Sequence, residues 1–377
     1  MPRAVDLRRG RAPDIVIASG AAYDFLLSLD VTLSEGESGA DWFDIGHTWV
    51  EQARAAYEAY APGALQTLGQ YLGDSRSSSL RATLLSLAGS RDETSSAKDF
   101  LNWLATMNLA DLTETLLDQD GLGSEWPSLL RAAQEELDAS PERTPGAATQ
   151  RLLDLYPRDA RPTALHVLRE TDAVREELVT ALWGWYDAVF AVEEERIAPL
   201  LAREAEALRL RRADTQPEVF IEREMRGVQW QRPAGLRRIV FAPSYFCRPA
   251  VFYHFWRGSL TFCFPIEVAA PGQSGVYADP TAPTSETLRF FEALGDGTRL
   301  RILRLLAERE MYLTELSERL HLTKATTKHH MVRLRAAGIV TLFVHERLTY
   351  YALRPDIGRR ANQMLDTLLN IGGPGER

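Results

Sequence analysis

The sequence predicts a mainly α protein with small β elements: a multi-helix N-terminal domain, a short β region and a C-terminal winged helix-turn-helix. Three observations support this fold class. The chain has 377 residues, more than one domain usually holds. Residues 19–210 are dominated by Leu, Ala, Glu, Arg and Gln, which favour helices. Residues 227–270 instead carry aromatic and β-branched residues broken by Pro and Gly, which is typical of short strands.

The domain boundaries follow these changes in composition. Residues 271–284 are rich in Pro, Gly, Ser and Thr, so we expect a linker there. Residues 1–226 are expected to form a helical effector and dimerisation domain, with the β region of residues 227–270 packed on it. Residues 285–355 are expected to form the winged helix-turn-helix, and residues 356–377 a C-terminal dimerisation helix and tail.

Local patterns place the elements before the linker. The longest helix is predicted over residues 171–212, because apolar residues such as Leu178, Leu182 and Phe190 recur with a helical period. Pro199 is expected to kink this helix or to start a new one. Short strands are expected over residues 237–242, 250–256 and 259–264, with Arg257-Gly258 at a hairpin tip.

The segment after the linker predicts an ordered array of short elements. Helices are expected over residues 285–294, 299–308, 314–320 and 324–336, followed by strands over residues 339–344 and 348–353. Thr314 is expected to cap the third helix and Gly338 to end the fourth. The second helix is expected to be apolar nearly all round. Two short helices joined by a three-residue turn, followed by a β-hairpin, describe a helix-turn-helix with a wing.

Charge is distributed unevenly along the chain. The net charge is −9 overall, but residues 285–377 hold 15 Lys and Arg against 11 Asp and Glu, a local charge of +4. A basic patch on an acidic protein is typical of an attached nucleic-acid-binding module. The patch therefore favours double-stranded DNA as a partner of the winged helix.

Helical geometry gives residues 324–336 an inner and an outer face. Thr327, His330, Met331 and Leu334 share one side and are expected to pack inward. The other side and the wing tip supply the predicted DNA contacts, which are Thr323, Lys324, Ala325, Thr326, Lys328, His329, Arg333 and Arg347. The alternative is an amphipathic helix whose basic face is merely solvated.

Four stretches together resemble a known family. They run from Phe291 to Leu306 (FEALGDGTRLRILRLL), from Leu313 to Leu322 (LTELSERLHL), from His330 to Val340 (HMVRLRAAGIV) and over Tyr350-Tyr-Ala-Leu353. This set resembles the winged-helix domain of ArsR-family bacterial transcriptional repressors. The resemblance implies a homodimer whose recognition helices read an inverted-repeat operator. The family often has Ser-Arg-His where this chain has Lys328-His329-His330.

The resemblance also bears on what controls the protein. Metal-sensing members carry a Cys-x-Cys sequence where this chain has Glu310-Met-Tyr-Leu-Thr-Glu-Leu316, and no His follows Asp356. We therefore expect no metal site, no cofactor and control by a non-metal ligand or partner. The segment before the winged helix is similar to a long helical domain of unknown function found in some members. Trp183, Tyr186 and Phe252 are proposed to line a ligand pocket, with core or dimer interface as the alternative.

Function follows from these observations. We expect a bacterial DNA-binding transcriptional regulator, acting as a repressor on the nucleoid in the cytoplasm, because the sequence shows neither a signal peptide nor a membrane span. Cys247 and Cys263 are expected to be buried thiols, and any redox role stays open. Common catalytic motifs are missing, so no enzyme is expected. The alternative is an enzyme or interaction scaffold in the N-terminal domain, tethered to DNA by the winged helix.

Overall fold

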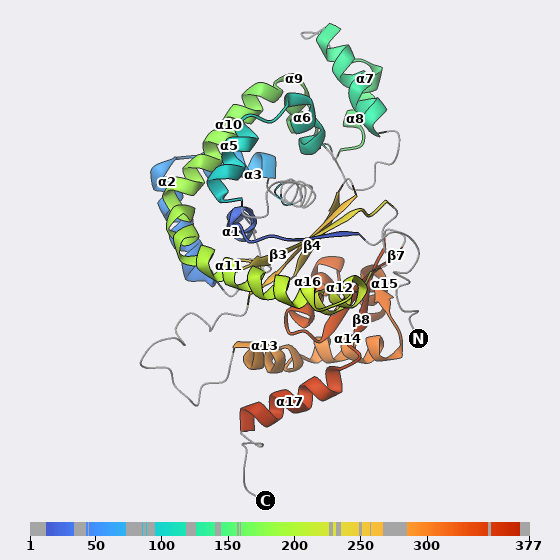
Figure 1. Cartoon of the computed structure of the whole chain (residues 1–377). Helices are drawn as coiled ribbons and strands as arrows, with labels where there is room; N and C mark the ends of the chain where they lie inside the picture. Colours follow the sequence, from blue (N-terminus) through green and yellow to red (C-terminus); the bar gives the residue numbers. More distant parts are fainter. Residues whose placement is uncertain are drawn as a thin grey trace, which may run out of the picture. The chain divides into compact units, whose positions relative to one another are not determined.

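The structure of the protein is a computed structural model (Figure 1). The described residues are 13–33, 43, 45–72, 85, 88, 95–117, 126–139, 145–156, 158, 160–225, 229–230, 235–248, 251–256, 258–266, 285–345 and 348–369. The predicted fold class is confirmed: most elements are helices, and short strands accompany them. The expected linker at residues 271–284 and the proposed wing contact Arg347 lie outside the described residues, as does the side chain of Ala325.

The chain divides into two compact units. The N-terminal unit comprises Ile15–Leu208 and Arg238–Ile266, and the winged-helix unit comprises Met1–Asp14, Arg209–Arg237 and Glu267–Arg377. Each unit therefore contains segments that are distant in the sequence.

Helices make up most of the N-terminal unit. They are α1 (Ala22–Leu33), α2 (His47–Tyr60), α3 (Ala64–Leu72), α5 (Ala97–Ala105), α6 (Leu109–Leu117), α7 (Trp126–Ala139), α8 (Ala147–Leu153), α9 (Arg161–Arg169), α10 (Thr171–Trp185) and α11 (Ala191–Ala213), whose end belongs to the other unit. Helix α10 packs against α3, α5, α6 and α9. Large side chains such as Tyr57, Phe100 and Trp185 are fully buried between these helices. Among the described residues, no helix is both long and apolar enough to cross a membrane.

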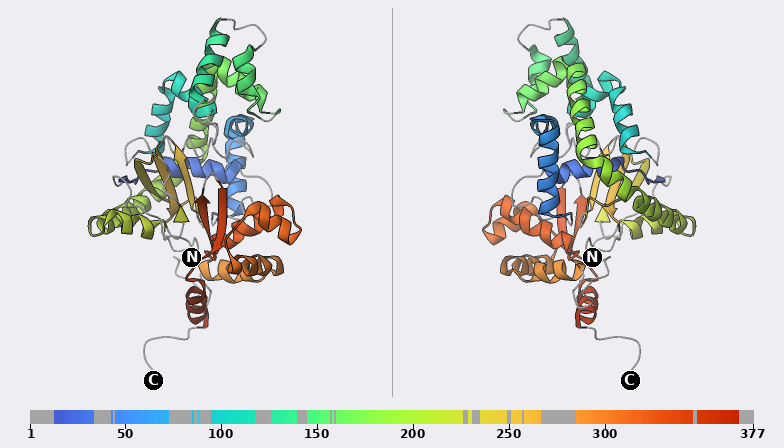
Figure 2. Two further views of the ribbon diagram at one scale, coloured as in Figure 1. Left: turned by 90° about the vertical axis from the view of Figure 1, so that its right-hand side faces the viewer. Right: turned by 90° about the vertical axis from the view of Figure 1, so that its left-hand side faces the viewer.

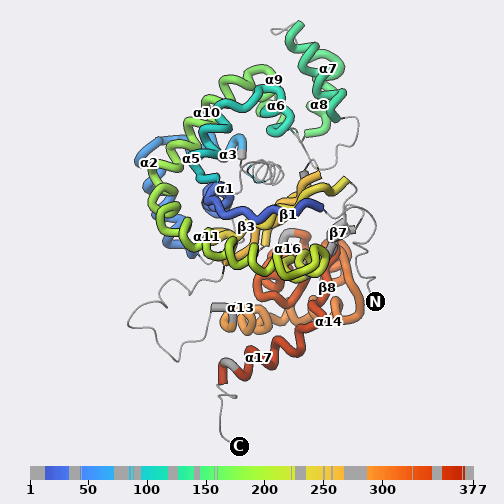
Figure 3. Tube along the Cα trace, in the orientation of Figure 1, coloured from blue at the N-terminus to red at the C-terminus, as the bar shows by residue number. Residues whose placement is uncertain are grey.

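The long helix predicted over residues 171–212 is interrupted at another place than expected. One π-helical turn, Tyr186–Phe190, joins α10 to α11, and the three segments follow one continuous path (Figure 3). Pro199 lies inside α11 and starts no new helix. The interruption instead falls where Tyr186 and Phe190 are buried side by side, with ring centroids 6.4 Å apart. A π-helical turn shifts the register of the buried stripe, which lets both rings reach the core.

The N-terminal unit also contains a four-stranded sheet. Its order is β1 (Asp14–Ile17), β3 (Arg238–Ser244), β5 (Ser259–Pro265) and β4 (Phe252–Trp256). β3 and β5 are parallel, and β4 and β5 form the predicted antiparallel hairpin. Gly258 adopts a φ of +81° at its tip, a conformation that favours glycine. β1 was not expected from the sequence.

The winged-helix unit contains the array predicted after the linker. Its elements are α12 (Pro217–Glu224), β2 (Gln229–Trp230), α13 (Ser285–Leu294), α14 (Gly297–Glu308), β6 (Met311–Tyr312), α15 (Leu313–Leu320), α16 (Lys324–Ala336), β7 (Val340–His345), β8 (Leu348–Leu353) and α17 (Ile357–Leu369). β7 and β8 are antiparallel neighbours, coloured orange to red in Figure 2, and form the wing. The bounds of α13, α16 and β8 are those predicted.

Two details of this array differ from the expectations. Helix α15 begins at Leu313 after Tyr312, so Thr314 lies inside the helix instead of capping it. Helix α14 is amphipathic: Ile302 and Leu306 are buried, whereas Leu300 is 49% exposed. Helix α14 has more apolar side chains than its packed side can bury, so some of them, such as Leu300, are exposed to solvent.

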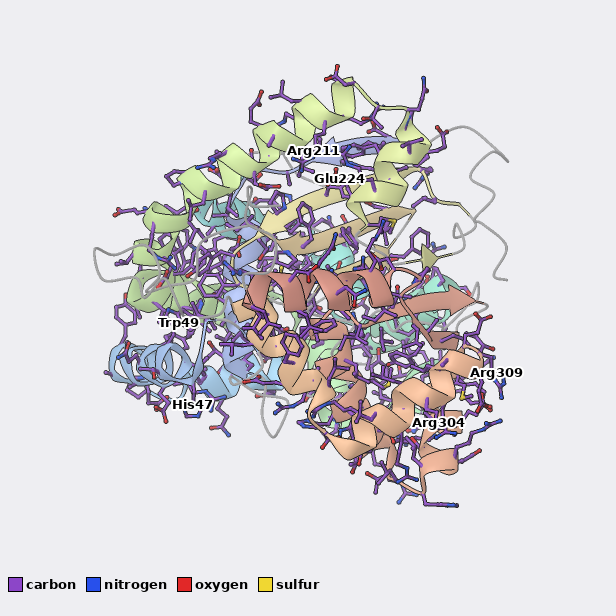
Figure 4. All side chains as sticks on the ribbon, turned by 90° about the horizontal axis from the view of Figure 1, so that it is seen from below. His47, Trp49, Arg211, Glu224, Arg304 and Arg309 are labelled. Carbon is purple, nitrogen blue, oxygen red and sulfur yellow. The ribbon has the colours of Figure 1, made fainter. Side chains whose placement is uncertain are left out.

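An additional strand from before the linker completes the wing sheet. Its order is β2-β7-β8-β6, and β2 pairs in parallel with β7, with Gln229 opposite Phe343 and Trp230 opposite Val344. The same unit holds an ion pair between Arg211 of α11 and the buried Glu224 of α12, with Nε and Oε1 3.1 Å apart (Figure 4). Residues 229–230 were assigned from the sequence to the β region of residues 227–270 without a predicted strand, and they instead add a strand to the sheet of the winged-helix unit.

Candidate nucleic-acid interface

A sharp turn sets the start of helix α16. His321 has the left-handed φ of 57°, and the Leu322 N–H donates to the Ser317 carbonyl at 3.0 Å, which ends α15. Thr323 then caps α16, because its Oγ1 accepts the Thr326 N–H at 3.1 Å. This capped turn is the connection of a helix-turn-helix, as the sequence predicted.

The inner face of α16 fixes the helix against the unit. Thr327, Met331 and Leu334 are fully buried, as expected. His330 is also turned inward, with Nδ1 3.7 Å from Oδ1 of Asp296. Desolvation lowers the pKa of His330, and the neighbouring carboxylate only partly opposes this effect. His330 is therefore neutral near pH 7 and belongs to the packing of the helix.

The outer face of α16 is the exposed, basic one. Thr323, Lys324, Thr326, Lys328 and Arg333 are exposed, and His329 is half-buried. Within this face the Arg333 Nε donates a hydrogen bond to Nε2 of His329 at 3.1 Å. The structure therefore places six of the eight residues proposed from the sequence on one continuous surface, with Ala325 and Arg347 outside its description.

The charges of α16 suit an anionic partner. Its sequence, KATTKHHMVRLRA, holds four Lys and Arg and no acidic residue. The N–H groups of its first turn add the positive end of the helix dipole next to Lys324. The arginines of α14 and of the residue after it have different surroundings. Arg309, directly after α14, is paired with Glu315, and its Nη1 lies 3.1 Å from Oε2 of that residue. Arg304, within α14, is exposed (Figure 4). Helix α14 contains the carboxylate of Glu308, whereas α16 contains no carboxylate that would offset its basic charge.

Asp296 supports this surface and was not singled out by the sequence. Its Oδ1 accepts the Arg299 N–H at 2.8 Å and caps α14, and this bond holds the pKa of Asp296 below its usual value. The Arg299 guanidinium in turn donates to the Ala293 carbonyl at 2.8 Å, at the end of α13. The Asp-x-x-Arg spacing after α13 is the signal by which this junction could have been found.

The comparisons with known proteins concern this part of the chain. The family model described as bacterial regulatory protein, arsR family, matches residues 296–341, which span α14 to β7. An uncharacterized HTH-type transcriptional regulator of Bacillus subtilis, YceK, is 34% identical over 70 residues, which are 18% of this chain and 70% of that protein. The chain belongs to the ArsR family.

Two further relatives of this ArsR-family chain align with a similar share of its length. The arsenic resistance transcriptional regulator ArsR1 of Pseudomonas putida is 34% identical over 76 residues, so the alignment spans 20% of this chain and 59% of that regulator. HlyU from Vibrio cholerae, a solved structure, is 26% identical, with a TM-score of 0.19 and coverage of 22% of this chain and 91% of HlyU. The family assignment thus identifies a DNA-binding regulator, and the matched residues 296–341 all lie in the winged-helix unit.

The aromatic residues proposed as pocket lining fall into two groups. Trp183 and Tyr186 contact each other edge to face, with centroids 5.7 Å apart. Phe252 instead stacks on Phe43 at 6.3 Å, in a cluster with Val31 and Val50. The structure therefore brings Trp183 and Tyr186 together and places Phe252 in a separate packing cluster.

Buried polar groups of the N-terminal unit were missed by the sequence analysis. Asp24 of α1 is fully buried, and its Oδ1 accepts hydrogen bonds from the Ser244 hydroxyl at 2.6 Å and the Tyr245 and Phe246 N–H groups at 2.9 and 2.8 Å. Cys247 and Cys263 are buried thiols that form no disulfide. Burial raises the pKa of the Cys263 thiol, which keeps it protonated. No group of three or more His, Cys, Asp or Glu suited to a metal ion occurs among the described residues.

Proposed function

We propose that the protein is a transcriptional repressor that binds an inverted-repeat operator as a homodimer, on the nucleoid in the cytoplasm, under the control of a non-metal ligand. The observation that carries the DNA-binding part is the exposed face of α16, where Lys324, Lys328 and Arg333 follow a capped helix start. Such a helix inserts its N-terminal side chains into the major groove, and its N–H groups contact phosphate. The ArsR-family match covers the same helices.

The homodimer is supported by an apolar surface on α13 and α17. Leu288 is 47% exposed, and Leu365, Leu368 and Leu369 of α17 are 41%, 43% and 59% exposed. The Thr287 hydroxyl lies 3.7 Å from the Met364 sulfur, so the two helices are in contact. Leucines that are exposed on two adjoining helices favour a second copy as their cover, and a two-fold pair would present two α16 helices to one palindromic site.

Control by a ligand of the N-terminal unit is supported by what that unit and the winged helix contain. The stretch Glu310–Leu316, which spans the start of α15, has no thiol for a thiophilic ion. The N-terminal unit is larger than dimerisation requires, and buried polar atoms such as Oδ2 of Asp24 and Oγ1 of Thr261 have no hydrogen-bond partner among the described residues, which a bound ligand would supply. A ligand acts on DNA affinity only through different affinities for the two conformations of the protein.

The experiment selects operator sequences from random duplex DNA with the full-length protein and measures their binding by fluorescence anisotropy. We expect an inverted repeat with half-sites about one helical turn apart. Selection of no sequence, or of a single half-site bound by one chain, would contradict the proposal.

A second titration tests the control. Zinc, cadmium and arsenite are added to the protein–operator complex, and no release of DNA is expected. Release at concentrations near those of the protein would show a metal sensor and overturn the proposed ligand class.

A further inference from the structure

Strand β5 has a polar and an apolar side. Ser259, Thr261 and Cys263 alternate with Leu260, Phe262 and Phe264, so the two sets point to opposite faces of the sheet. The register adds two polar residues of the neighbouring strands to this side, because Arg238 of β3 lies opposite Ser259 and His254 of β4 lies opposite Thr261. The other residues opposite Thr261 and Cys263 are apolar, namely Val240, Ala242 and Phe252. We call the side of the sheet that carries Arg238, His254, Ser259, Thr261 and Cys263 the polar face.

The polar face is buried at His254, Thr261 and Cys263 and half-buried at Arg238 and Ser259. Alternation of this kind is typical of a strand with one side in water. Thr261 and Cys263 are each only 1% exposed, however, and His254 is 8% exposed. Helix α1 covers this side, because Asp24 of α1 binds the Ser244 hydroxyl, which belongs to the same set of alternate residues on β3. A strand side whose sequence is typical of contact with water is therefore mostly buried, with Arg238 and Ser259 at its less buried end.

Three side chains of the polar face have buried polar atoms with no hydrogen-bond partner among the described residues. They are Nε of Arg238, Oγ of Ser259 and Oγ1 of Thr261. A buried donor without an acceptor costs about 1–3 kcal/mol, and more when the group is charged. Three such groups in adjacent register positions indicate that something outside the polypeptide completes them.

Tyr23 of α1 is buried in the same unit as the polar face. Burial is the main cause that raises its pKa, and the Arg238 guanidinium opposes this effect, so the phenol stays protonated.

We propose that the polar face binds the carboxylate of a small organic anion, held by Arg238 with the hydroxyls of Ser259 and Thr261. A guanidinium pairs with a carboxylate through two parallel hydrogen bonds, and hydroxyls complete the remaining lone pairs. One guanidinium balances the single charge of a carboxylate, whereas a phosphate dianion would leave one charge buried and unpaired. A metal cation would be repelled by Arg238.

The nearest buried carboxylate of α1 does not supply this partner. Oδ1 of Asp24 accepts hydrogen bonds from Ser244 and the turn after β3, and its Oδ2 is buried without a hydrogen-bond partner among the described residues. Ser244 lies six residues along β3 from Arg238, about 20 Å at the usual rise of a strand. An anion from outside the chain is therefore the occupant that fits the polar face. This inference rests on the proposed function only where it takes the anion to be the ligand that controls DNA binding.

Thermal unfolding of the full-length protein without DNA tests the binding. The probes are acetate and benzoate, with acetamide and benzamide as neutral isosteres and inorganic phosphate as a second anion. We expect the carboxylates, and neither the amides nor phosphate, to raise the melting temperature, because a ligand that binds only the folded state stabilises it. Arg238→Met should weaken carboxylate binding at least about tenfold, or about 1.4 kcal/mol, and Thr261→Val should weaken it severalfold.

Two matched variants control for the loss of an arginine elsewhere and for a failure of Arg238→Met to fold. Arg203→Met, at an exposed arginine of α11, should bind carboxylates as the wild type does. Arg238→Lys keeps the charge and loses the fork, so it should bind more weakly than the wild type even if Arg238→Met fails to fold. Equal shifts with benzoate and benzamide, an unchanged response of both Arg238 variants, or a shift with phosphate alone would overturn the proposal.

Two outcomes separate this inference from the proposed function. If no carboxylate shifts unfolding up to its solubility, the polar face binds no such anion and the inference is wrong. If benzoate binds the protein but leaves the affinity for the selected operator unchanged, the site stands and the proposed control of DNA binding by this ligand fails.

Discussion

Arg333 and His329 form a hydrogen bond on the outer face of α16, from Nε of the guanidinium to Nε2 of the imidazole at 3.1 Å. The bond requires His329 to carry its proton on Nδ1 and to be neutral. It holds the long arginine side chain along the helix before DNA is bound, which lowers the entropy that binding has to remove.

The first prediction is that these two residues act as a unit in DNA binding. We expect His329→Ala and Arg333→Ala to be non-additive in a double-mutant cycle, with an interaction energy of about 0.5–3 kcal/mol measured by anisotropy on the selected operator. His329→Ala combined with Arg301→Ala, at an exposed arginine of α14, should be additive. Additivity of both pairs would show that the bond has no part in recognition.

Specificity and overall affinity should separate between α16 and the wing. Lys328→Ala, on the exposed face of α16, should relax the sequence preference and cost about 1–3 kcal/mol for each base that the lysine binds in the operator. Arg347→Ala should weaken binding evenly for all sequences and reduce the slope of log affinity against log salt by about one. The measurement is anisotropy over a series of salt concentrations with operator and scrambled duplexes, and the reverse pattern would exchange the two roles.

The buried carboxyl of Asp24 should make the stability of the N-terminal unit depend on pH. Burial raises its pKa from 3.8 to about 6, against the opposing effect of hydrogen bonds from Phe246, Ser244 and Tyr245. The folded state then binds more protons than the unfolded state between about pH 4 and pH 6, so stability falls as pH rises through this range. The free energy of unfolding should decrease by about 3 kcal/mol, measured by urea unfolding followed by tryptophan fluorescence.

Two substitutions of Asp24 separate charge from hydrogen bonding. Asp24→Asn keeps an acceptor oxygen for Ser244, Tyr245 and Phe246 and cannot ionise, so its stability should lose this pH dependence. Asp24→Ala should be destabilised at every pH, because it leaves the buried donors of the turn without an acceptor. An unchanged pH profile in Asp24→Asn would assign the dependence to another group.

The exposed leucines of α17 should be needed for the homodimer. Leu365→Glu combined with Leu368→Glu places charges on the proposed apolar interface, and we expect a monomer with strongly reduced operator affinity. Light scattering at micromolar concentration measures the mass, and circular dichroism confirms folding. Gln363→Glu, on the opposite side of the same helix, should remain dimeric. A dimer in the double variant would place the interface elsewhere.

Sequence patterns were most informative where local interactions decide the structure. Helix α16 has the predicted bounds because Thr323 caps it and the buried residues Thr327, Met331 and Leu334 recur with a helical period towards its end. The proposed DNA contacts follow from the same geometry, since a residue on the opposite side of a helix from a buried stripe is exposed. Six of the eight could be placed on the outer face for this reason.

Long-range partners explain what local patterns could not indicate. β1 has four residues and is defined by hydrogen bonds such as the one from the Ala18 N–H to the Phe241 carbonyl, 2.9 Å long. Asp24 and Ser244 are likewise 220 residues apart in the sequence and meet only in the folded unit. Their pairing depends on tertiary contacts, and neither residue lies in a sequence motif that indicates the other.

The strand β2 leads to the last prediction, which concerns how much of the chain the DNA-binding unit needs. β2 covers one edge of β7 by parallel pairing through Gln229 and Trp230, yet it precedes the conventional start of a winged helix at Ser285. A fragment of residues 285–377 therefore leaves that edge of the wing with unpaired N–H and C=O groups, which favour association with other strands. A fragment of residues 209–377 retains α12, β2 and the Arg211–Glu224 pair. We expect the longer fragment to melt at a higher temperature and to stay dimeric, whereas the shorter one forms larger species in size-exclusion chromatography.

A variant of the longer fragment with Gln229→Pro and Trp230→Pro should behave like the shorter one, because proline cannot donate to a strand partner. Equal melting temperatures and equal sizes for the two fragments would show that β2 is dispensable for the wing.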